Sequence, residues 1–492
     1  MSIFVSIKRL FKHSAVYGIG HIVSRSINFL LLPLYTNIFP RDDYGVVGLM
    51  FTYIAILTIV YTYGLDAAFF RFYILEDDPT QRRKIFSTSF FTILVTSVLF
   101  SGIIFLNAET ISRLIFSAEV RQLPVGLPHL IRLASGILMF DALSFLPYLI
   151  LRAEERPVPF AIFKVINVLI NVVSNILLLG VFKMGIDGIF LANLIASFST
   201  FLLLAPVGLK HIGFAFSWVR LRELFAFGIP YLPSTLAVVI MDTIDRPLLE
   251  RLDSIEAAGL YNAGVKLGMF MALFVAAYRF AWHPFFLSTS KQENAKSIFS
   301  RVFTYVLLAC FFVFLFFSLF IDDIARFSIR GYSLIGQQYW ESTVVVPVVM
   351  LAYVFYAAYL NFLIGIYLEK KTKYLPYITI AGMIGNLLAN YFLIPVMGIM
   401  GAAWARFVAY LIMAVALYFV GQRLYPVRYE WGRIAKLCLT VGVVFAIGKT
   451  DFINQHILIK LVFFSLFPLF LFIVRFFDEA EVNKIRRILL QR

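Results

Sequence analysis

Long apolar segments separated by short polar connections make up almost the whole chain. A helix needs about 20 apolar residues to cross the hydrocarbon layer of a membrane, and most of these segments have that length. They lack the alternation of apolar and polar positions that a transmembrane barrel requires. The pattern predicts an all-α, polytopic membrane bundle with about fourteen transmembrane helices, at residues 14–38, 45–73, 85–107, 127–151, 158–181, 185–209, 223–248, 257–287, 299–321, 342–367, 374–396, 398–420, 433–448 and 455–475.

The composition agrees with this pattern. The 492 residues are 61% hydrophobic and only 14% charged, and the mean hydropathy is +0.87. These values exclude a soluble globular domain. Cys310 and Cys438 lie in separate apolar segments, and the six histidines form no spaced cluster with them. We therefore expect no disulfide framework, no metal site and no cofactor.

The net charge of +15 reflects topology. If the N-terminus is cytoplasmic, most of the 43 Lys and Arg residues fall in cytoplasmic segments, as the positive-inside rule requires. This predicts a multi-pass protein with both termini in the cytoplasm, and it gives no reason to expect nucleic acid as a partner. The spacing of apolar positions beside basic ones predicts a cytoplasmic interfacial helix at residues 1–13 and an amphipathic tail at 476–492.

An internal repeat divides the chain. "NVVSN" at 171–175, followed by "MGIDGIFLANLIASF", matches "NLLAN" at 386–390, followed by "MGIMGAAWARFVAYL"; "YGIGHIVSRS" from Tyr17 matches "FGIPYLPSTL" from Phe227. Offsets of 210 to 215 residues predict two parallel six-helix lobes, residues 14–210 and 211–420, followed by a two-helix extension at 421–475. Transporters of this design bind substrate between the lobes near the midplane and rock one lobe against the other.

Basic residues inside the predicted spans are the main candidates for function. A charge near the bilayer centre costs about 2.5–3.5 kcal/mol on insertion scales, so it needs a partner or a purpose. Some lie within about two turns of a span end, where the side chain can extend to the interface: Arg71, Arg132, Lys164 and Lys460. Others lie deeper and are candidate substrate contacts: Arg25, Lys266, Arg279 and Arg406.

Arg25 is the first candidate among these. His21, Arg25 and Asn28 follow one helix face at spacing i, i+4, i+7, which gives the first helix a polar face that lipid contact would not tolerate. The residue matched to Arg25 in the second half is Thr235, so the repeated scaffold does not itself require a charge there.

Asp66 and Asp141 lie at a depth similar to that of Arg25 and are candidate ion-pair or coupling residues. They leave two interpretations of Arg25 open, which are a structural ion pair and a contact with an anionic substrate. Either aspartate, or His21, could titrate in a proton-coupled cycle.

Lys266 and Arg279 are about 220° apart around an ideal helix, so an unbent helix cannot turn both toward one cavity. We favour Lys266, which Asp242 and Asp245 could hold in place, and leave Arg279 and Arg406 open. Two repeated asparagines have two interpretations, as bonds between helices or as polar walls of a cavity: Asn171 and Asn386.

The sequence resembles the polysaccharide transporters, or Wzx-type lipid-linked oligosaccharide flippases, of the multidrug/oligosaccharidyl-lipid/polysaccharide (MOP) superfamily. The resemblance covers essentially the whole chain. It rests on "YGIGHIVSRSINFLLLPLYTNIFPRDDYG", on "MDTIDRPLLERLDSIEAAGLYNAGVKLGMF" and on "GIMGAAWARF". It implies a MATE-like fold of twelve core helices with two extra ones.

The resemblance also implies a function. Undecaprenyl-diphosphate-linked oligosaccharide units would cross a bacterial inner membrane by alternating access, for O-antigen, capsule or exopolysaccharide export, with a polysaccharide polymerase and assembly proteins as partners. A diphosphate needs Arg or Lys in a low-dielectric cavity, which fits the deep basic residues. We expect translocation without catalysis.

Two alternatives to the flippase are weaker. A drug/cation antiporter of the same superfamily should show an acidic excess in its cavity, whereas the deep charges here are mainly basic. A membrane polymerase or ligase acting on lipid-linked glycans should carry its reactive groups on a large outer loop, and the outer loops are short and hold no acid/base constellation. The sequence does not identify the glycan, and it leaves proton, sodium or no coupling open.

Overall fold

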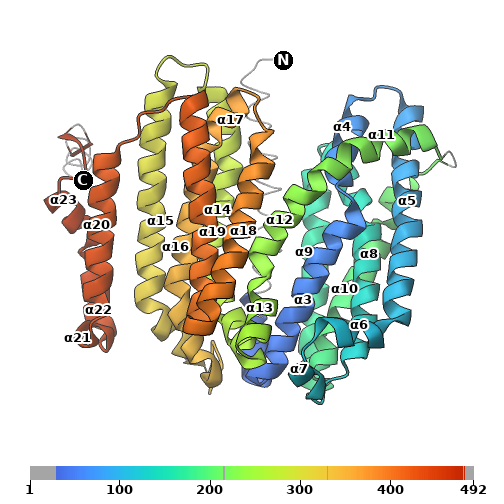
Figure 1. The fold of residues 1–492 in the computed structure, drawn as a ribbon, viewed down its shortest axis with the longest axis horizontal. Coiled ribbons are helices and arrows are strands. Elements are labelled where there is room, and N and C mark those ends of the chain that lie inside the picture. The colour runs from blue at the N-terminus through green and yellow to red at the C-terminus, as the bar shows by residue number, and fades with distance from the viewer. Residues whose placement is uncertain (1–28, 214–215, 330, 480, 483–492) are drawn as a thin grey trace.

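The structure, a computed structural model, describes residues 29–213, 216–329, 331–479 and 481–482 and is a bundle of long helices (Figure 1). Within these residues, 12 helices are long and apolar enough to cross a membrane, and they coincide with the second to thirteenth predicted spans. The shorter apolar segment Ile457–Ile473 coincides with the fourteenth. Most of the first span lies outside the described residues. The predicted all-α membrane bundle is confirmed.

The first group of helices, which we call the N-lobe, packs mainly around α8 and α10. It consists of α2 (Leu32–Ile38), α3 (Arg41–Thr62), α4 (Leu65–Leu75), α5 (Pro79–Leu106), α6 (Ala108–Ile115), α7 (Ala118–Gln122), α8 (Leu127–Ala153), α9 (Pro157–Asn175), the π-helical turn η1 (Ile176–Val181) and α10 (Ile186–Leu209).

The second group, the C-lobe, packs around α16, α18 and α19. It consists of α12 (Leu232–Thr243), α13 (Asp245–Leu252), α14 (Ile255–Thr289), α15 (Ala295–Arg326), a hairpin of β1 (Ser328–Ile329) and β2 (Tyr332–Ser333), η3 (Gln337–Val345), α16 (Val346–Phe362), α17 (Ile364–Leu368), α18 (Tyr374–Met397) and α19 (Ile399–Leu424). The extension comprises α20 (Trp431–Gly448), α21 (Asp451–Asn454), α22 (Ile457–Ser465) and α23 (Phe467–Ile473), and it packs on α15.

The repeat is visible in local backbone geometry. α10 and α19 each begin after a glycine with positive φ, Gly185 at 64° and Gly398 at 52°. Residues that carry a side chain rarely adopt a positive φ, whereas glycine adopts it freely and so permits the tight turn from the preceding helix. The matched glycines therefore place α9 against α10, and α18 against α19, in the same way in both lobes.

We call the end of the bundle that carries α6, α7 and α13 the outer end, and the end that carries α4, α11 and α17 the inner end, following the predicted topology (Figure 1). The lobes meet closely at the outer end. A Cβ on Gly259 of α14 would lie 1.9 Å from the carbonyl oxygen of Arg41 at the start of α3, and one on Gly45 would lie 2.3 Å from that of Ile255. Only glycine permits these approaches between α3 and α14.

Polar contacts reinforce this outer-end closure. Arg41 forms an ion pair of 3.0 Å with Glu341 of η3. The Tyr339 hydroxyl donates to the carbonyl oxygens of Phe39 and Pro40, at 3.0 and 2.8 Å. Both residues come directly before α3, so the contacts fasten the start of the N-lobe's α3 to the C-lobe's η3.

The helix α11 (Trp218–Gly228) connects the lobes at the inner end, and the short η2 (Ile229–Tyr231) joins it to α12. It runs across the bundle in Figure 1 and is fixed to the N-lobe. Arg220 pairs with Glu76 at 3.0 Å, and a Cβ on Gly64 would lie 2.4 Å from the carbonyl oxygen of Gly228. The segment between the lobes therefore begins on the N-lobe surface.

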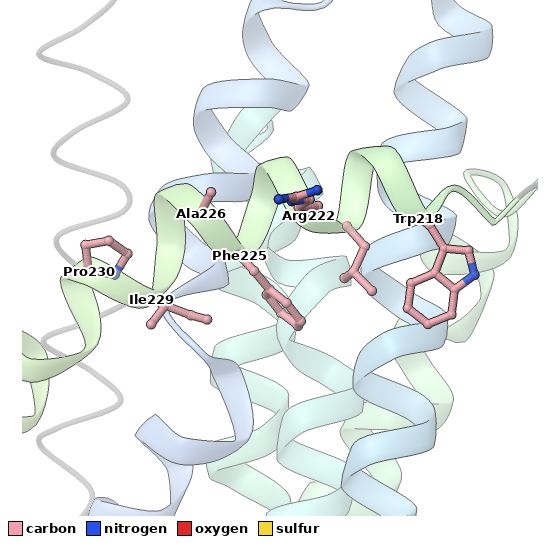
Figure 2. A pocket seen from close by; sticks show the side chains of 7 residues that line it. Trp218, Arg222, Phe225, Ala226, Ile229 and Pro230 are labelled. Carbon is pink, nitrogen blue, oxygen red and sulfur yellow. The ribbon is translucent and has the colours of Figure 1, made fainter.

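One side of α11 carries Trp218, Phe225 and Ile229 around an open hollow of about 670 Å³ (Figure 2). Trp218 is 76% exposed. An amphipathic helix with exposed aromatic and aliphatic residues at the end of a membrane bundle is typical of an interfacial anchor. We therefore assign this hollow to lipid contact and not to a substrate.

Candidate functional site

Lys266 lies where the two lobes meet. It projects from α14, and its Nζ lies 5.6 Å from the ring centroid of Tyr35 on α2 and 5.1 Å from that of Tyr44 on α3. Tyr44 is fully buried, and its hydroxyl has no hydrogen-bond partner among the residues that the structure describes. Within the described part of the chain, Lys266 has no carboxylate partner at ion-pairing distance. A half-buried ammonium between N-lobe aromatic rings is therefore available to an anion.

Arg246 on α13 is the second basic residue at the contact between the two lobes, which we call the seam. Its Nε donates to Oδ1 of Asn262 at 2.9 Å, and its side chain approaches Gly48 of α3. It is near enough to Lys266 for their like charges to repel. In the described residues its guanidinium also has no carboxylate partner within ion-pairing distance. Two like charges held close together, with no ion-pair partner among the described residues, favour the binding of an anion.

Arg406 lies in a different environment, the buried core of the C-lobe. Its Nη2 is 2.7 Å from Oδ2 of Asp245, and the two side chains are 2% and 0% exposed. Asp245 also accepts hydrogen bonds from Tyr261 at 2.8 Å and from Asn390 at 3.0 Å. Asn390 in turn donates to the Asn386 carbonyl at 3.0 Å. In this conformation the ion pair holds α13, α14, α18 and α19 together, and the Arg406 side chain is buried among these partners.

The matched positions of the N-lobe carry a neutral version of this core. Tyr35 corresponds to Asp245 and donates to Asn175 at 2.8 Å, just as Asn390 donates to Asp245. Asn193 corresponds to Arg406 and donates to the Ile189 carbonyl of its own helix. The repeat thus preserves the helix-to-helix bond but keeps the ion pair in one lobe only.

A polar cavity of about 410 Å³ lies between α8, α9 and α10 of the N-lobe, beside Asn193. Asp141 from α8 and Lys164 from α9 both line it, with the Lys164 Nζ 4.1 Å from the ring centroid of Tyr148. Asn171 lines the same cavity. Three of the residues selected from the sequence are therefore brought together here.

A second cavity, of about 240 Å³, lies inside the C-lobe between α12, α14, α16 and α19. Arg279 and Asp242 line it, so both predicted residues face this cavity. Asp242 accepts a hydrogen bond of 2.6 Å from the Tyr410 hydroxyl, while its backbone carbonyl accepts one of 2.9 Å from Arg406. Lys266 and Arg279 therefore face different surroundings, as their angular separation on α14 predicts.

The other predicted site residues are placed as follows. His21, Arg25 and Asn28 lie outside the described residues. Asp66 is exposed at the start of α4. Asn386 is fully buried in the Arg406 core.

Two expectations about charge partners are wrong. Asp245 does not hold Lys266, because its carboxylate is occupied by Arg406, Tyr261 and Asn390. Lys460 does not extend to the interface. It is 1% exposed and pairs with Asp323 of α15.

Sequence reasoning missed Arg246 and the aromatic walls of the seam. Arg246 lies in "MDTIDRPLL", where it closely follows two aspartates at the end of a predicted span. A basic residue at a span end usually reaches water, so its position in the sequence does not mark Arg246 as a site residue. The signal in the sequence is Pro247, which directly follows Arg246, because a proline inside a helix removes a backbone hydrogen bond and so marks a local break.

This geometry defines a two-lobed bundle of membrane-spanning helices whose lobes meet at one end, with basic side chains in the seam that have no ion-pair partner among the described residues. Solved structures share the fold. "Lipid II flippase MurJ, inward closed conformation" matches with a TM-score of 0.74 at 16% identity, over 92% of this chain and 98% of that one. An inward-facing multidrug resistance MATE family transporter of the MOP superfamily matches with a TM-score of 0.64 at 16% identity, over 85% and 96%. The chain has the MOP fold.

The family follows from sequence comparison. A family model described as "Polysaccharide biosynthesis protein" matches residues 10–290, more than half of the chain, and the chain belongs to this family. "Lsg locus putative protein 1" of Haemophilus influenzae is 20% identical over 292 residues, which are 58% of this chain and 68% of that protein. These findings confirm the resemblance to Wzx-type polysaccharide flippases.

Proposed function

We propose that this protein moves undecaprenyl-diphosphate-linked oligosaccharide units from the cytoplasmic to the outer face of a bacterial inner membrane by alternating access. Both termini are cytoplasmic in this proposal. The observation that carries it is the pair of basic side chains, Lys266 and Arg246, in the seam between the lobes. No carboxylate of the described residues neutralises either one by an ion pair.

The chemistry of the seam suits a diphosphate. In a low-dielectric surrounding, hydrogen bonds between ionised groups are shorter and stronger than those between neutral groups, and a guanidinium can bind two phosphate oxygens at once. The Tyr44 hydroxyl, which has no partner in the described part of the chain, supplies a further donor. Arg25 remains a proposed third cation.

The position of these groups also suits alternating access. Lys266 belongs to the C-lobe, whereas Tyr35 and Tyr44 belong to the N-lobe. An anion bound by Lys266 would therefore alter contacts between the lobes and so influence their relative position. A charge buried within one lobe, such as Arg406, would have no such effect.

A transport assay with charge-neutralising variants tests the proposal. Translocation of a fluorescent lipid-linked oligosaccharide is measured in cells that hold each variant at matched membrane levels. We expect Lys266→Met, Arg246→Gln and Arg25→Ala each to reduce transport at least about tenfold, since a hydrogen bond to a charged group contributes about 1.5–3 kcal/mol. Lys266→Arg should retain part of the activity.

Arg132→Gln is the matched control, because Arg132 lies beside Phe105 within the N-lobe, away from the seam. It should transport at the wild-type rate. Wild-type transport by correctly inserted Lys266→Met and Arg246→Gln proteins would refute the assignment of the seam as the diphosphate site.

A further inference from the structure

The C-lobe cavity has an aromatic wall that the diphosphate does not need. Three tyrosines of α16 and one of α19 line it: Tyr353, Tyr356, Tyr359 and Tyr410. The rings of Tyr356 and Tyr359 lie nearly parallel, at an interplanar angle of 13° and a centroid distance of 5.9 Å. The Tyr356 and Tyr410 rings are 5.0 Å apart. These side chains form one continuous aromatic surface.

Polar groups converge on the same cavity. Arg279 is exposed to it and lies near Tyr359. The Asp242 carboxylate faces it from α12, with Oδ1 already occupied by Tyr410. Within the described residues, neither Tyr356 nor Tyr359 uses its hydroxyl in a hydrogen bond. The cavity thus offers ring faces, hydrogen-bond donors and an acceptor within one small space.

This combination matches the chemistry of a pyranose ring. One face of such a ring presents C–H groups, which pack on aromatic faces because those faces carry the negative part of the ring quadrupole. Its edge presents hydroxyl groups, each of which both donates and accepts hydrogen bonds. Arg279 and the tyrosine hydroxyls can donate to those oxygens, and Asp242 can accept from a hydroxyl. A drug-like cation would require an acidic excess, and Arg279 opposes that.

We infer that this tyrosine-lined cavity, bounded by Asp242 and Arg279, is a subsite for a neutral or N-acetylated hexopyranose of the lipid-linked glycan. The inference rests on the proposed function, because the sugar reaches the cavity only as part of that substrate. It assigns the diphosphate to the lobe seam and the sugar to the C-lobe. Substitutions in the seam should therefore change the affinity for the diphosphate, and substitutions in the cavity should change the affinity for the sugar.

Binding to the purified full-length protein in lipid nanodiscs tests the inference. The two probes are undecaprenyl diphosphate and the same carrier bearing one N-acetylglucosamine. We expect wild-type protein to bind the sugar-bearing carrier about tenfold more tightly. Tyr356→Leu and Arg279→Gln should reduce this preference to about threefold or less without changing the affinity for the bare carrier. Tyr356→Phe should keep most of it, since the ring face remains.

Two variants serve as controls. Tyr391→Leu removes a tyrosine that is 60% exposed on α18 and lies outside the cavity, and it should keep the full preference. Lys266→Met should weaken binding of both probes equally. Because Arg279 is exposed, Arg279→Gln tests the cavity even if Tyr356→Leu fails to fold.

The outcomes separate the two proposals. An unchanged sugar preference in Tyr356→Leu and Arg279→Gln, or no preference in the wild type, overturns the subsite while the flippase proposal stands. If the wild-type protein binds neither probe, the proposed function fails and the subsite fails with it.

Discussion

The two lobes share a helical scaffold but use it differently at their centres. In the C-lobe, Arg406 and Asp245 form an ion pair that is almost completely shielded from solvent. In the N-lobe, Asn193 and Tyr35 occupy the matched positions, and a polar cavity of about 410 Å³ lies beside Asn193. The repeated scaffold therefore carries a closed ion pair in one lobe and a polar cavity in the other.

This difference separates two roles that a membrane charge can have. A buried pair with all of its partners inside one lobe stabilises that lobe and is closed to a ligand. Lys266, which lies between the lobes, has no ion-pair partner among the described residues and contacts two aromatic rings instead. Depth in the membrane therefore does not separate these two environments, whereas the partners of each charge do.

Breaking the C-lobe ion pair should give the largest effect on stability. Asp245→Asn leaves the Arg406 guanidinium without its counter-ion, and such a loss destabilises a protein by about 3–5 kcal/mol. We expect a strong fall in the melting temperature of the purified protein and in membrane yield. A melting temperature close to that of the wild type would show that the pair does not hold the lobe together.

Neutralising both partners should restore part of this loss. The double variant Asp245→Asn/Arg406→Met removes both charges, keeps an acceptor at position 245 and resembles the neutral N-lobe core. It should be more stable than Asp245→Asn by at least about 1 kcal/mol, because residues of one network couple. Thermal unfolding of the two single variants and the double variant measures this coupling, and simple additivity would contradict it.

The matched change in the N-lobe should be much milder. Tyr35→Phe removes the hydrogen bond to Asn175 but keeps the ring beside Lys266. An interhelical hydrogen bond in a membrane protein contributes about 0.6 kcal/mol on average, so we expect a small decrease in melting temperature. A decrease as large as that of Asp245→Asn would remove the contrast between the lobes.

Asp141→Asn should have the smallest effect. Its carboxylate faces the N-lobe cavity, where it retains access to other polar groups, so we expect stability within about 0.5 kcal/mol of the wild type. Melting temperature again gives the measurement. A large destabilisation would mean that Asp141 and Lys164 stabilise the N-lobe as strongly as the ion pair of Arg406 and Asp245 stabilises the C-lobe.

The sequence predicts the spans and the repeat because both depend on local pattern, that is, on apolar runs of membrane length and on matched segments such as "NVVSN" and "NLLAN". It also identifies Asp141 and Arg279 as deep charges, but it pairs neither of them with the residue that shares its cavity, Lys164 or Asp242. It does not predict partners, because depth is only one coordinate. Asp245 is turned toward Arg406 instead of Lys266 by the way α13 packs on α18 and α19, which no single helix encodes.

The contact of Gly64 with Gly228 has a mechanical consequence. Because backbone packs directly on backbone there, we expect α11 to move with the N-lobe as one rigid body. Any rocking of one lobe against the other should then bend the chain just beyond α11, at η2 and the start of α12. Pro230 in η2 and Pro233 at the start of α12 each lack a backbone donor, so bending there would break fewer hydrogen bonds.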